Sequence, residues 1–204
     1  MGTTADKLNH IINTKEGIRQ ELNRAYKTEE INTSDTFNSY IQKLEEHPLY
    51  VDMFIERSIK DIKITNAINI GYAAFGYCTS LTNASFPNVT SIGDYAFRYC
   101  SNLTSVSIPN TTSIGRSAFY ECSSLISVSF PNATSIGSTA FKDCSKLTTI
   151  YVGTNTSTVC TLSSTNAFNN CTNLTNIYVP ASLLSNYKSA TNWSSYSSKI
   201  KAAP

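Results

Sequence analysis

The side chains that could do chemistry in this sequence are six cysteines, two histidines and a few acidic residues. Six thiols could form disulfides or a metal site. Five of them recur at one position of a repeat, without any C-x-x-C pair: Cys78, Cys100, Cys122, Cys144 and Cys171. We therefore predict an inward ladder of buried free thiols that behave as small apolar side chains. Cys160 falls outside this register in an insertion, where we expect an exposed thiol that could link to another chain.

Nucleophilic catalysis needs a base beside the nucleophile, and histidine is the usual base. The two histidines, His10 and His47, both precede the repetitive part of the chain. No phosphate-binding glycine motif is present in the sequence. The repetitive part therefore has no Cys–His or Ser–His–Asp set of its own.

One pair of carboxylates remains, because Glu121 and Asp143 occupy equivalent positions of adjacent repeats. Stacked repeats would bring their backbones to within ~5 Å, which approaches the carboxyl separation of retaining glycosidases. Arg98 and Lys142 occupy the neighbouring position and can neutralise both carboxylates on a solvated surface. We predict that the protein is not an enzyme and has no catalytic residue, no metal ligand and no cofactor.

Composition excludes several classes of partner. The formal net charge is +2, so no global field favours nucleic acid or an anionic membrane. No apolar run is long enough to span a bilayer, so we expect no membrane insertion, and no signal peptide is visible. Residues 1–58 carry seven Lys/Arg and ten Asp/Glu, whereas the longer stretch 59–180 carries six and four. The stretch 59–180 has few charged residues, so a different feature of the sequence must explain how it folds.

That feature is a repeat with a period of 22 residues. Ile-Gly pairs recur at 70–71, 92–93, 114–115 and 136–137, and Ala-Phe pairs at 74–75, 96–97, 118–119 and 140–141. A leucine follows each repeat cysteine, three copies share a Pro-Asn pair, and a fifth copy follows a five-residue insertion. One unit cannot bury its own apolar residues, so neighbouring units must stack with their strands ~4.8 Å apart.

Local patterns predict the shape of one unit. Alternation of polar and apolar residues at the end of Leu103–Ile108 predicts a half-buried strand. Pro109 ends that strand because it has no N–H to donate. We expect Gly115 to permit a turn that a Cβ would hinder. We also expect Ala118–Phe119 to face the core, with successive phenylalanine rings stacked along the axis.

The pattern I-G-x-x-A-F-x-x-C-x-x-L-x-x-V-x-[FI]-P resembles the BspA-like leucine-rich repeat, also called the Treponema pallidum type. The resemblance covers residues 59–180. The last copies depart from it, with Gly153 in place of the proline and a longer loop at Thr154–Thr165. It implies a curved solenoid with strands on its concave side, and roles in adhesion or protein interaction.

We predict a leucine-rich-repeat solenoid preceded by a small N-terminal helical element. Residues 51–180 would form the β-rich solenoid, with about five 22-residue repeats, a partial leading one, and short strands stacked in one parallel sheet. Residues 181–204 would cap its end with one or two short helices, and we expect Trp193 and Tyr187 to pack in that cap. Residues 1–50 would form the helical leader.

The leader begins with a capping box at Thr3 and Asp6, before a helix from about Ala5 to Tyr26. Its apolar stripe fits a heptad seam that would join copies of the chain into a homo-oligomer, and consists of Leu8, Ile11, Ile18 and Leu22. A second helix starts at Ser34, so a helical hairpin within one chain is the alternative. The sequence leaves both arrangements open.

The leader also resembles that of tail and baseplate proteins of phages that infect Gram-positive bacteria. The matching residues are Thr4–Leu8, Thr14-Lys15, Ile18, Ser34–Phe37, Tyr40 and Lys43-Leu44. This resemblance implies that the leader attaches and oligomerises the protein while the solenoid is displayed. It would place the protein in the virion, and the alternative location is the bacterial cell surface or the extracellular medium.

Strand alternation predicts which side chains leave the core. A flat, hydroxyl-rich strand face with two tyrosines at one end suits sugars and comprises Asn83, Ser85, Ser107, Ser129, Tyr151, Asn176 and Tyr178. A second surface at the turns is rich in Tyr and Arg, which are common at binding hot spots. This turn surface comprises Tyr77, Tyr95, Arg98, Tyr99, Arg116 and Tyr120. For any single residue, the alternative is ordinary solvated repeat surface.

These patterns together predict a non-enzymatic binding or adhesion module whose partner is a protein or a surface glycan. The first candidate is a phage tail or baseplate component that recognises a bacterial surface. The alternative is a bacterial cell-surface or secreted adhesin that binds host protein.

Overall fold

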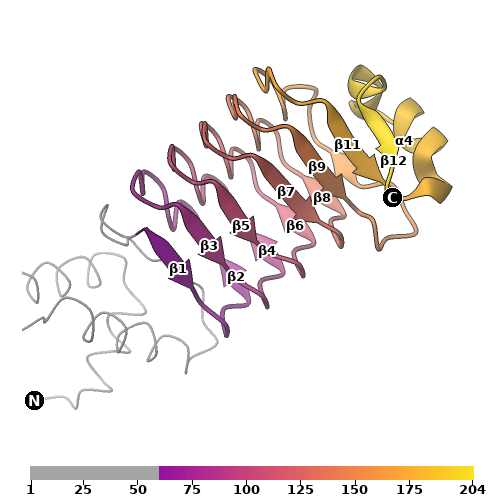
Figure 1. Ribbon diagram of the computed structural model, residues 1–204. Helices are drawn as coiled ribbons and strands as arrows, with labels where there is room; N and C mark the ends of the chain where they lie inside the picture. Colours follow the sequence, from indigo (N-terminus) through magenta and orange to yellow (C-terminus); the bar gives the residue numbers. More distant parts are fainter. Residues whose placement is uncertain (1–59) are drawn as a thin grey trace, which may run out of the picture.

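A computed structural model describes residues 60–204, which wind into a solenoid of stacked coils that ends in a small cap (Figure 1). The predicted helical leader at 1–50 lies outside the described residues. So do its proposed oligomerisation seam, formed by Leu8, Ile11, Ile18 and Leu22, and its resemblance to phage leaders.

Each of the first five coils contributes one strand to each of two rows of parallel strands, and the last coil contributes only a long strand before the cap (Figure 1). The long-strand row contains β1 (Asp61–Lys63), β3 (Asn83–Ser85), β5 (Ser105–Ser107), β7 (Ser127–Phe130), β9 (Thr149–Val152) and β11 (Asn176–Val179). The short-strand row contains β2 (Asn69–Ile70), β4 (Ser91–Ile92), β6 (Ser113–Ile114), β8 (Ser135–Ile136) and β10 (Thr161–Leu162). The prediction of one sheet is therefore wrong. Strands of two residues are too short to show an alternating pattern, so the second row has no signature in the sequence.

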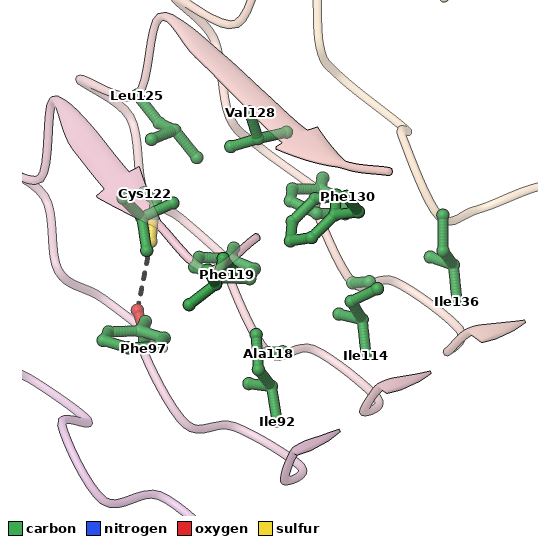
Figure 2. Close-up of a cluster of buried hydrophobic side chains, with 14 of the residues drawn as sticks. Ile92, Phe97, Ile114, Ala118, Phe119, Cys122, Leu125, Val128, Phe130 and Ile136 are labelled. Atoms are coloured by element: carbon green, nitrogen blue, oxygen red, sulfur yellow. Dashed lines mark hydrogen bonds between the residues drawn. The ribbon is translucent and has the colours of Figure 1, made fainter. Parts of the chain in front are cut away.

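Apolar columns fill the space between the two rows, and a column of phenylalanines forms its centre. The rings of Phe75, Phe97, Phe119, Phe141 and Phe168 stack in order along the axis. Neighbouring centroids are 5.0 to 5.6 Å apart, and neighbouring rings are inclined by 15° or less. Isoleucines at the ends of the short strands form a second column, of which Figure 2 shows Ile92, Ile114 and Ile136. The predicted ring stack is confirmed.

The glycine of each Ile-Gly pair lies where two coils approach most closely. A Cβ on Gly115 would come within 2.6 Å of backbone atoms of Gly93 and Asp94. A Cβ on Gly137 would come within 2.5 Å of backbone atoms of Gly115 and Arg116. Glycine is required at these positions because the neighbouring backbone leaves no room for a side chain.

The cap closes the last coil with η1 (Ala181–Leu183), α4 (Leu184–Ser189), η2 (Trp193–Tyr196) and the strand β12 (Ile200–Ala202) (Figure 1). Tyr187 and Trp193 are fully buried and meet edge to face at 5.3 Å, so the predicted packing is confirmed. The cap also contains a strand that was not predicted. β12 pairs with β11 in parallel and places Ile200 beside Ile177, which adds one more rung to the long-strand row.

Cys160 is buried, with an exposed fraction of 0%, so the prediction of an exposed thiol is wrong. The insertion ends before this residue, which directly precedes β10 and turns inward under the cap. The Cys160 N–H donates to Tyr187 Oη at 2.9 Å, and Trp193 Nε1 donates to the Cys160 carbonyl at 2.6 Å. The cap thus covers both polar backbone groups of Cys160.

Threonines in front of the long strands reinforce the backbone ladder. Thr104 Oγ1 donates to the Thr82 carbonyl at 3.0 Å, and Thr148 Oγ1 donates to the Ile126 carbonyl at 3.1 Å. Ile126 occupies the same position in the coil between them, where it has no hydroxyl and is 52% exposed. The long-strand row is interrupted in that coil, because β5 and β7 do not pair.

The close approach at the glycines predicts that Gly115→Ala destabilises the protein. We expect a loss of about 1–3 kcal/mol, because the new Cβ must displace the backbone of the preceding coil. Gly76→Ala is the matched control, since the nearest atom to its Cβ is a carbonyl oxygen at 3.3 Å. Thermal unfolding should separate the two variants by several degrees. Equal melting temperatures of the two variants would contradict the prediction, because they would show that the neighbouring backbone can move aside without loss of stability.

The missing hydroxyl predicts that Ile126→Thr stabilises the protein. A threonine at this position could donate to the Thr104 carbonyl, as Thr104 does to Thr82. One such hydrogen bond contributes about 0.5–1.5 kcal/mol, which chemical denaturation can measure. Ile126→Val is the control, because valine is also β-branched but has no hydroxyl. An equal gain in both variants would assign the effect to the exposed isoleucine and not to the hydrogen bond.

Candidate functional site

The five cysteines of the repeat are buried and form no disulfide, as predicted. Each thiol after the first also donates to the carbonyl of the phenylalanine of the preceding coil, which the sequence did not reveal. Cys122 Sγ lies 3.1 Å from the Phe97 oxygen (Figure 2). The equivalent distances in the other coils are 2.9 to 3.0 Å. Burial raises the pKa of the Cys100, Cys122 and Cys144 thiols, so the ladder is a structural element with little thiolate character.

Glu121 and Asp143 lie on the turn surface, at left-handed positions with φ of 56° and 63°. Asp143 accepts a hydrogen bond from Asn170 Nδ2 at 2.6 Å, and Lys142 Nζ lies 4.0 Å from its Oδ2. Asp143 is therefore held by an amide and a cation within the chain. Within residues 60–204, no cluster of three His, Cys, Asp or Glu side chains is placed to hold a metal ion. In the same range, no helix is long and apolar enough to cross a membrane.

The strand face carries the outward side chains of the long strands in register. Ser85 lies beside Ser107 across β3 and β5, and Ser129 lies beside Tyr151 across β7 and β9. Tyr178 follows Tyr151 on β11. The structure thus aligns the predicted residues, in two blocks separated by the gap between β5 and β7.

The serine hydroxyls of the strand face differ from the polar groups that flank them. Neighbouring threonines and asparagines bind carbonyl oxygens of the preceding coil, as in Thr104 to Thr82 at 3.0 Å and Asn110 to Pro87 at 2.8 Å. The serines make no such bond, and all four in the middle of the face are exposed: Ser105, Ser107, Ser127 and Ser129. Their donors and acceptors remain available to a ligand.

Two stacked tyrosines end the row of serines. The rings of Tyr151 and Tyr178 are parallel to within 23°, with centroids 4.9 Å apart. Lys201 on β12 lies beside Tyr178 and donates to Asn176 Oδ1. Lys201 was missed at the sequence level, although Ile200-Lys201 repeats the alternation of Ile177-Tyr178. Asn176 is therefore engaged within the chain, and so is Asn83, which donates to Asp61.

Several tyrosines of the turn surface have a left-handed backbone conformation. Tyr77, Tyr95 and Tyr99 have φ of 64°, 61° and 62°. This conformation is unfavourable for residues other than glycine. Their N–H groups donate to carbonyl oxygens of the following coil at 2.7 to 2.9 Å. Because the neighbouring coil holds the backbone, each tyrosine leaves the turn in a defined direction.

Cations and rings alternate on this surface in the order Arg116, Tyr95, Arg98, Tyr120, Lys142, which we call the tyrosine–cation row. The guanidinium carbons of Arg116 and Arg98 both lie 5.4 Å from the Tyr95 centroid. Arg98 lies 5.5 Å from the Tyr120 centroid, and Lys142 Nζ lies 5.7 Å from the same point. The structure therefore unites the predicted turn residues into one cluster.

Arg98 occupies the centre of this cluster. Its guanidinium carbon is 4.6 Å from the Tyr99 centroid and 5.8 Å from that of Tyr77. Arg98 Nη2 donates to Tyr99 Oη at 3.4 Å, and this bond raises the pKa of Arg98. Loss of hydration and the nearby Glu121 carboxylate raise the pKa of Tyr120 to about 12. At neutral pH the surface thus presents a charged Arg98 beside a protonated Tyr120.

Comparison with known proteins identifies the repeat. Residues 47–163 and 90–202 match the family described as the BspA type leucine rich repeat region, in six copies. This match spans more than half of the chain and confirms the resemblance seen in the repeat pattern. No curated protein sequence matches the chain.

Solved structures of bacterial proteins share the fold. A leucine rich repeat protein of Treponema pallidum is 24% identical, with a TM-score of 0.54 over 63% of this chain and 62% of that one. A leucine-rich repeat protein of Bacteroides ovatus is 22% identical, with a TM-score of 0.52 over 74% and 41%. The pneumococcal vaccine antigen PcpA is 20% identical, with a TM-score of 0.51 over 60% and 30%. The chain spans less than two thirds of each protein, and these identities show the fold alone.

Burial of the thiols predicts that the protein loses stability in alkali. Burial raises the pKa of Cys160 to about 12, whereas an unfolded cysteine has a pKa of about 8.5. Above about pH 9 the unfolded chain therefore binds fewer protons than the folded one. The free energy of unfolding falls by about 1.4 kcal/mol per pH unit for each such thiol.

Urea unfolding of the wild type and Cys160→Ala between about pH 9 and 10 isolates this effect, because the two proteins share every other titrating group. The free energy of unfolding should fall with pH in both proteins. The slope of the variant should be smaller than that of the wild type by about 1.4 kcal/mol per pH unit. Parallel slopes in the two proteins would contradict the burial of Cys160.

Proposed function

The chain belongs to the BspA-type leucine-rich repeat family, and on this premise we propose that it is a non-enzymatic binding and adhesion module whose strand face recognises a surface glycan. The main support is the set of exposed serine hydroxyls without internal partners, formed by Ser105, Ser107, Ser127 and Ser129. Each hydroxyl can donate one hydrogen bond and accept two, which matches the mixed donors and acceptors of a sugar.

The spacing of the strands favours an extended, repetitive ligand. Equivalent serines of neighbouring coils are ~4.8 Å apart where their strands pair, as for Ser85 and Ser107 across β3 and β5, whereas β5 and β7 do not pair. Ser105 and Ser107 point to the same side of β5, as do Ser127 and Ser129 of β7. The four hydroxyls carry no charge, so a neutral or weakly charged chain of sugars fits them better than a polyanion.

The tyrosine pair supplies an apolar wall beside these serines. Tyr178 covers one side of the Tyr151 ring, whereas the small side chain of Ser129 neighbours its other side. A pyranose ring could therefore stack on Tyr151 while its hydroxyls bind the serines. Few precisely placed polar groups beside an aromatic surface are typical of small-ligand sites.

Two settings for this module remain proposals. In the first, the protein is a tail or baseplate component of a phage and recognises a bacterial surface, which rests on the resemblance of the leader alone. In the second, it is a bacterial cell-surface or secreted adhesin that binds host protein. Binding to intact bacterial cells favours the first setting, and binding to immobilised host proteins favours the second.

The first test is a pull-down of fluorescently labelled protein on a panel of intact Gram-positive cells, with and without periodate treatment to destroy exposed glycans. We expect saturable binding that periodate abolishes and trypsin treatment of the cells does not. Tyr151→Ala/Tyr178→Ala should weaken binding by about tenfold or more, because the variant loses the aromatic wall.

Tyr77→Ala is the matched control, since it removes an exposed tyrosine from the turn surface and leaves the strand face intact. If binding resists periodate but is abolished by trypsin treatment of the cells, the receptor is a protein and the glycan proposal is wrong. Absence of binding to every strain in a broad panel would contradict the receptor-binding role and favour a structural role in assembly.

A further inference from the structure

The turn surface holds two cations without an ionic partner. In the part of the chain that the structure describes, the one ion pair within 4.0 Å joins Lys142 to Asp143. Arg98 and Arg116 contact tyrosine rings instead of carboxylates. The nearby carboxylate of Asp94 binds backbone instead of a guanidinium group, because its Oδ1 accepts a hydrogen bond from the backbone N–H of Arg116 at 2.7 Å. Both guanidinium groups thus retain donors for an external anion.

The tyrosines hold the guanidinium group of Arg98 in place. Arg98 is in contact with four rings, at 4.6 to 5.8 Å from their centroids: Tyr77, Tyr95, Tyr99 and Tyr120. A planar guanidinium that is already oriented loses less entropy when it binds a carboxylate through two hydrogen bonds. The cluster is therefore better prepared for an anion than a free surface arginine would be.

The geometry limits the spacing of the anionic groups. Both guanidinium carbons lie 5.4 Å from the Tyr95 centroid, so they are at most about 11 Å apart. In an extended peptide, side chains at i and i+2 point to the same side and lie about 7 Å apart. Two acidic residues at these positions can therefore reach both arginines at once.

The surface around the arginines fits a peptide better than a polysaccharide. Tyr72 and Tyr77 are 60% and 49% exposed at one end of the cluster, and offer large apolar contact areas. Tyrosine and arginine are among the residue types most enriched at protein hot spots. Two free cations are too few for the counterion release that drives binding of long polyanions.

We propose that the turn surface is a second binding site, which takes an extended acidic segment of a protein partner with carboxylates at i and i+2. Arg98 and Arg116 bind the two carboxylates, and the exposed tyrosines pack against the residues next to them. This site is separate from the strand face, so it does not depend on the glycan-binding proposal.

The test uses fluorescence anisotropy of the full chain with a labelled decapeptide that alternates glutamate with leucine. A peptide with glutamine in place of glutamate is the matched control. We expect the glutamate peptide to bind at least about tenfold more tightly, as is usual for charge-assisted pairs. Arg98→Gln/Arg116→Gln should lose this preference while its melting temperature stays close to that of the wild type.

Lys60→Gln/Lys188→Gln controls for the loss of two positive charges, because both lysines are exposed and lie outside the turn surface. It should bind the glutamate peptide as the wild type does, and so should Tyr151→Ala/Tyr178→Ala. Equal affinity for the two peptides would overturn the proposal, and so would full binding by the double arginine variant. Tighter binding of dextran sulfate than of the glutamate peptide would overturn it in favour of an anionic polysaccharide.

Discussion

The fixed distance between hydrogen-bonded coils decides what each position of this repeat can contain. Paired parallel strands are ~4.8 Å apart, so every side chain meets its own equivalent in the next coil at nearly that distance. Phenylalanine satisfies this condition by stacking at 5.0 to 5.6 Å. Glycine is required where the backbones come closer still, as at Gly115 and Gly137. Cysteine fits between these sizes, and its thiol also donates to a carbonyl of the preceding coil.

The same condition separates structural polar groups from those that are free to bind. A threonine or an asparagine can reach back by one coil, and its side chain then becomes part of the ladder, as Thr104 and Asn110 do. The serine hydroxyls of β5 and β7 make no such bond. Serines and threonines look alike in the sequence, because both are small hydroxyl residues. Hydrogen-bond geometry distinguishes the threonines that stabilise the ladder from the serines that make no such bond.

Periodicity alone predicted the features that every coil repeats, namely the ring stack, the buried thiols and the outward strand positions. It failed where a single coil departs from the others. Cys160 follows an insertion that changes the register, and its burial depends on contacts with Tyr187 and Trp193 of the cap. The gap between β5 and β7 lies beside Ile126, which stands without a hydroxyl in a column of threonines. The tyrosine–cation row combines side chains from two turn positions, so no single column of the sequence reveals it.

The hydrogen bonds that stabilise the coils also hold the backbone of the proposed turn-surface site. Tyr77, Tyr95 and Tyr99 adopt a conformation that costs roughly 1–2 kcal/mol per residue, and each is held there by a hydrogen bond to the next coil. A hydrogen bond contributes about 1 kcal/mol, so backbone pairing offsets much of that cost before any partner arrives. Side chains anchored in this way lose little further freedom on binding. Repetition therefore supplies rigidity, while the substitution of Tyr and Arg at a few turn positions supplies the chemistry that a partner can recognise.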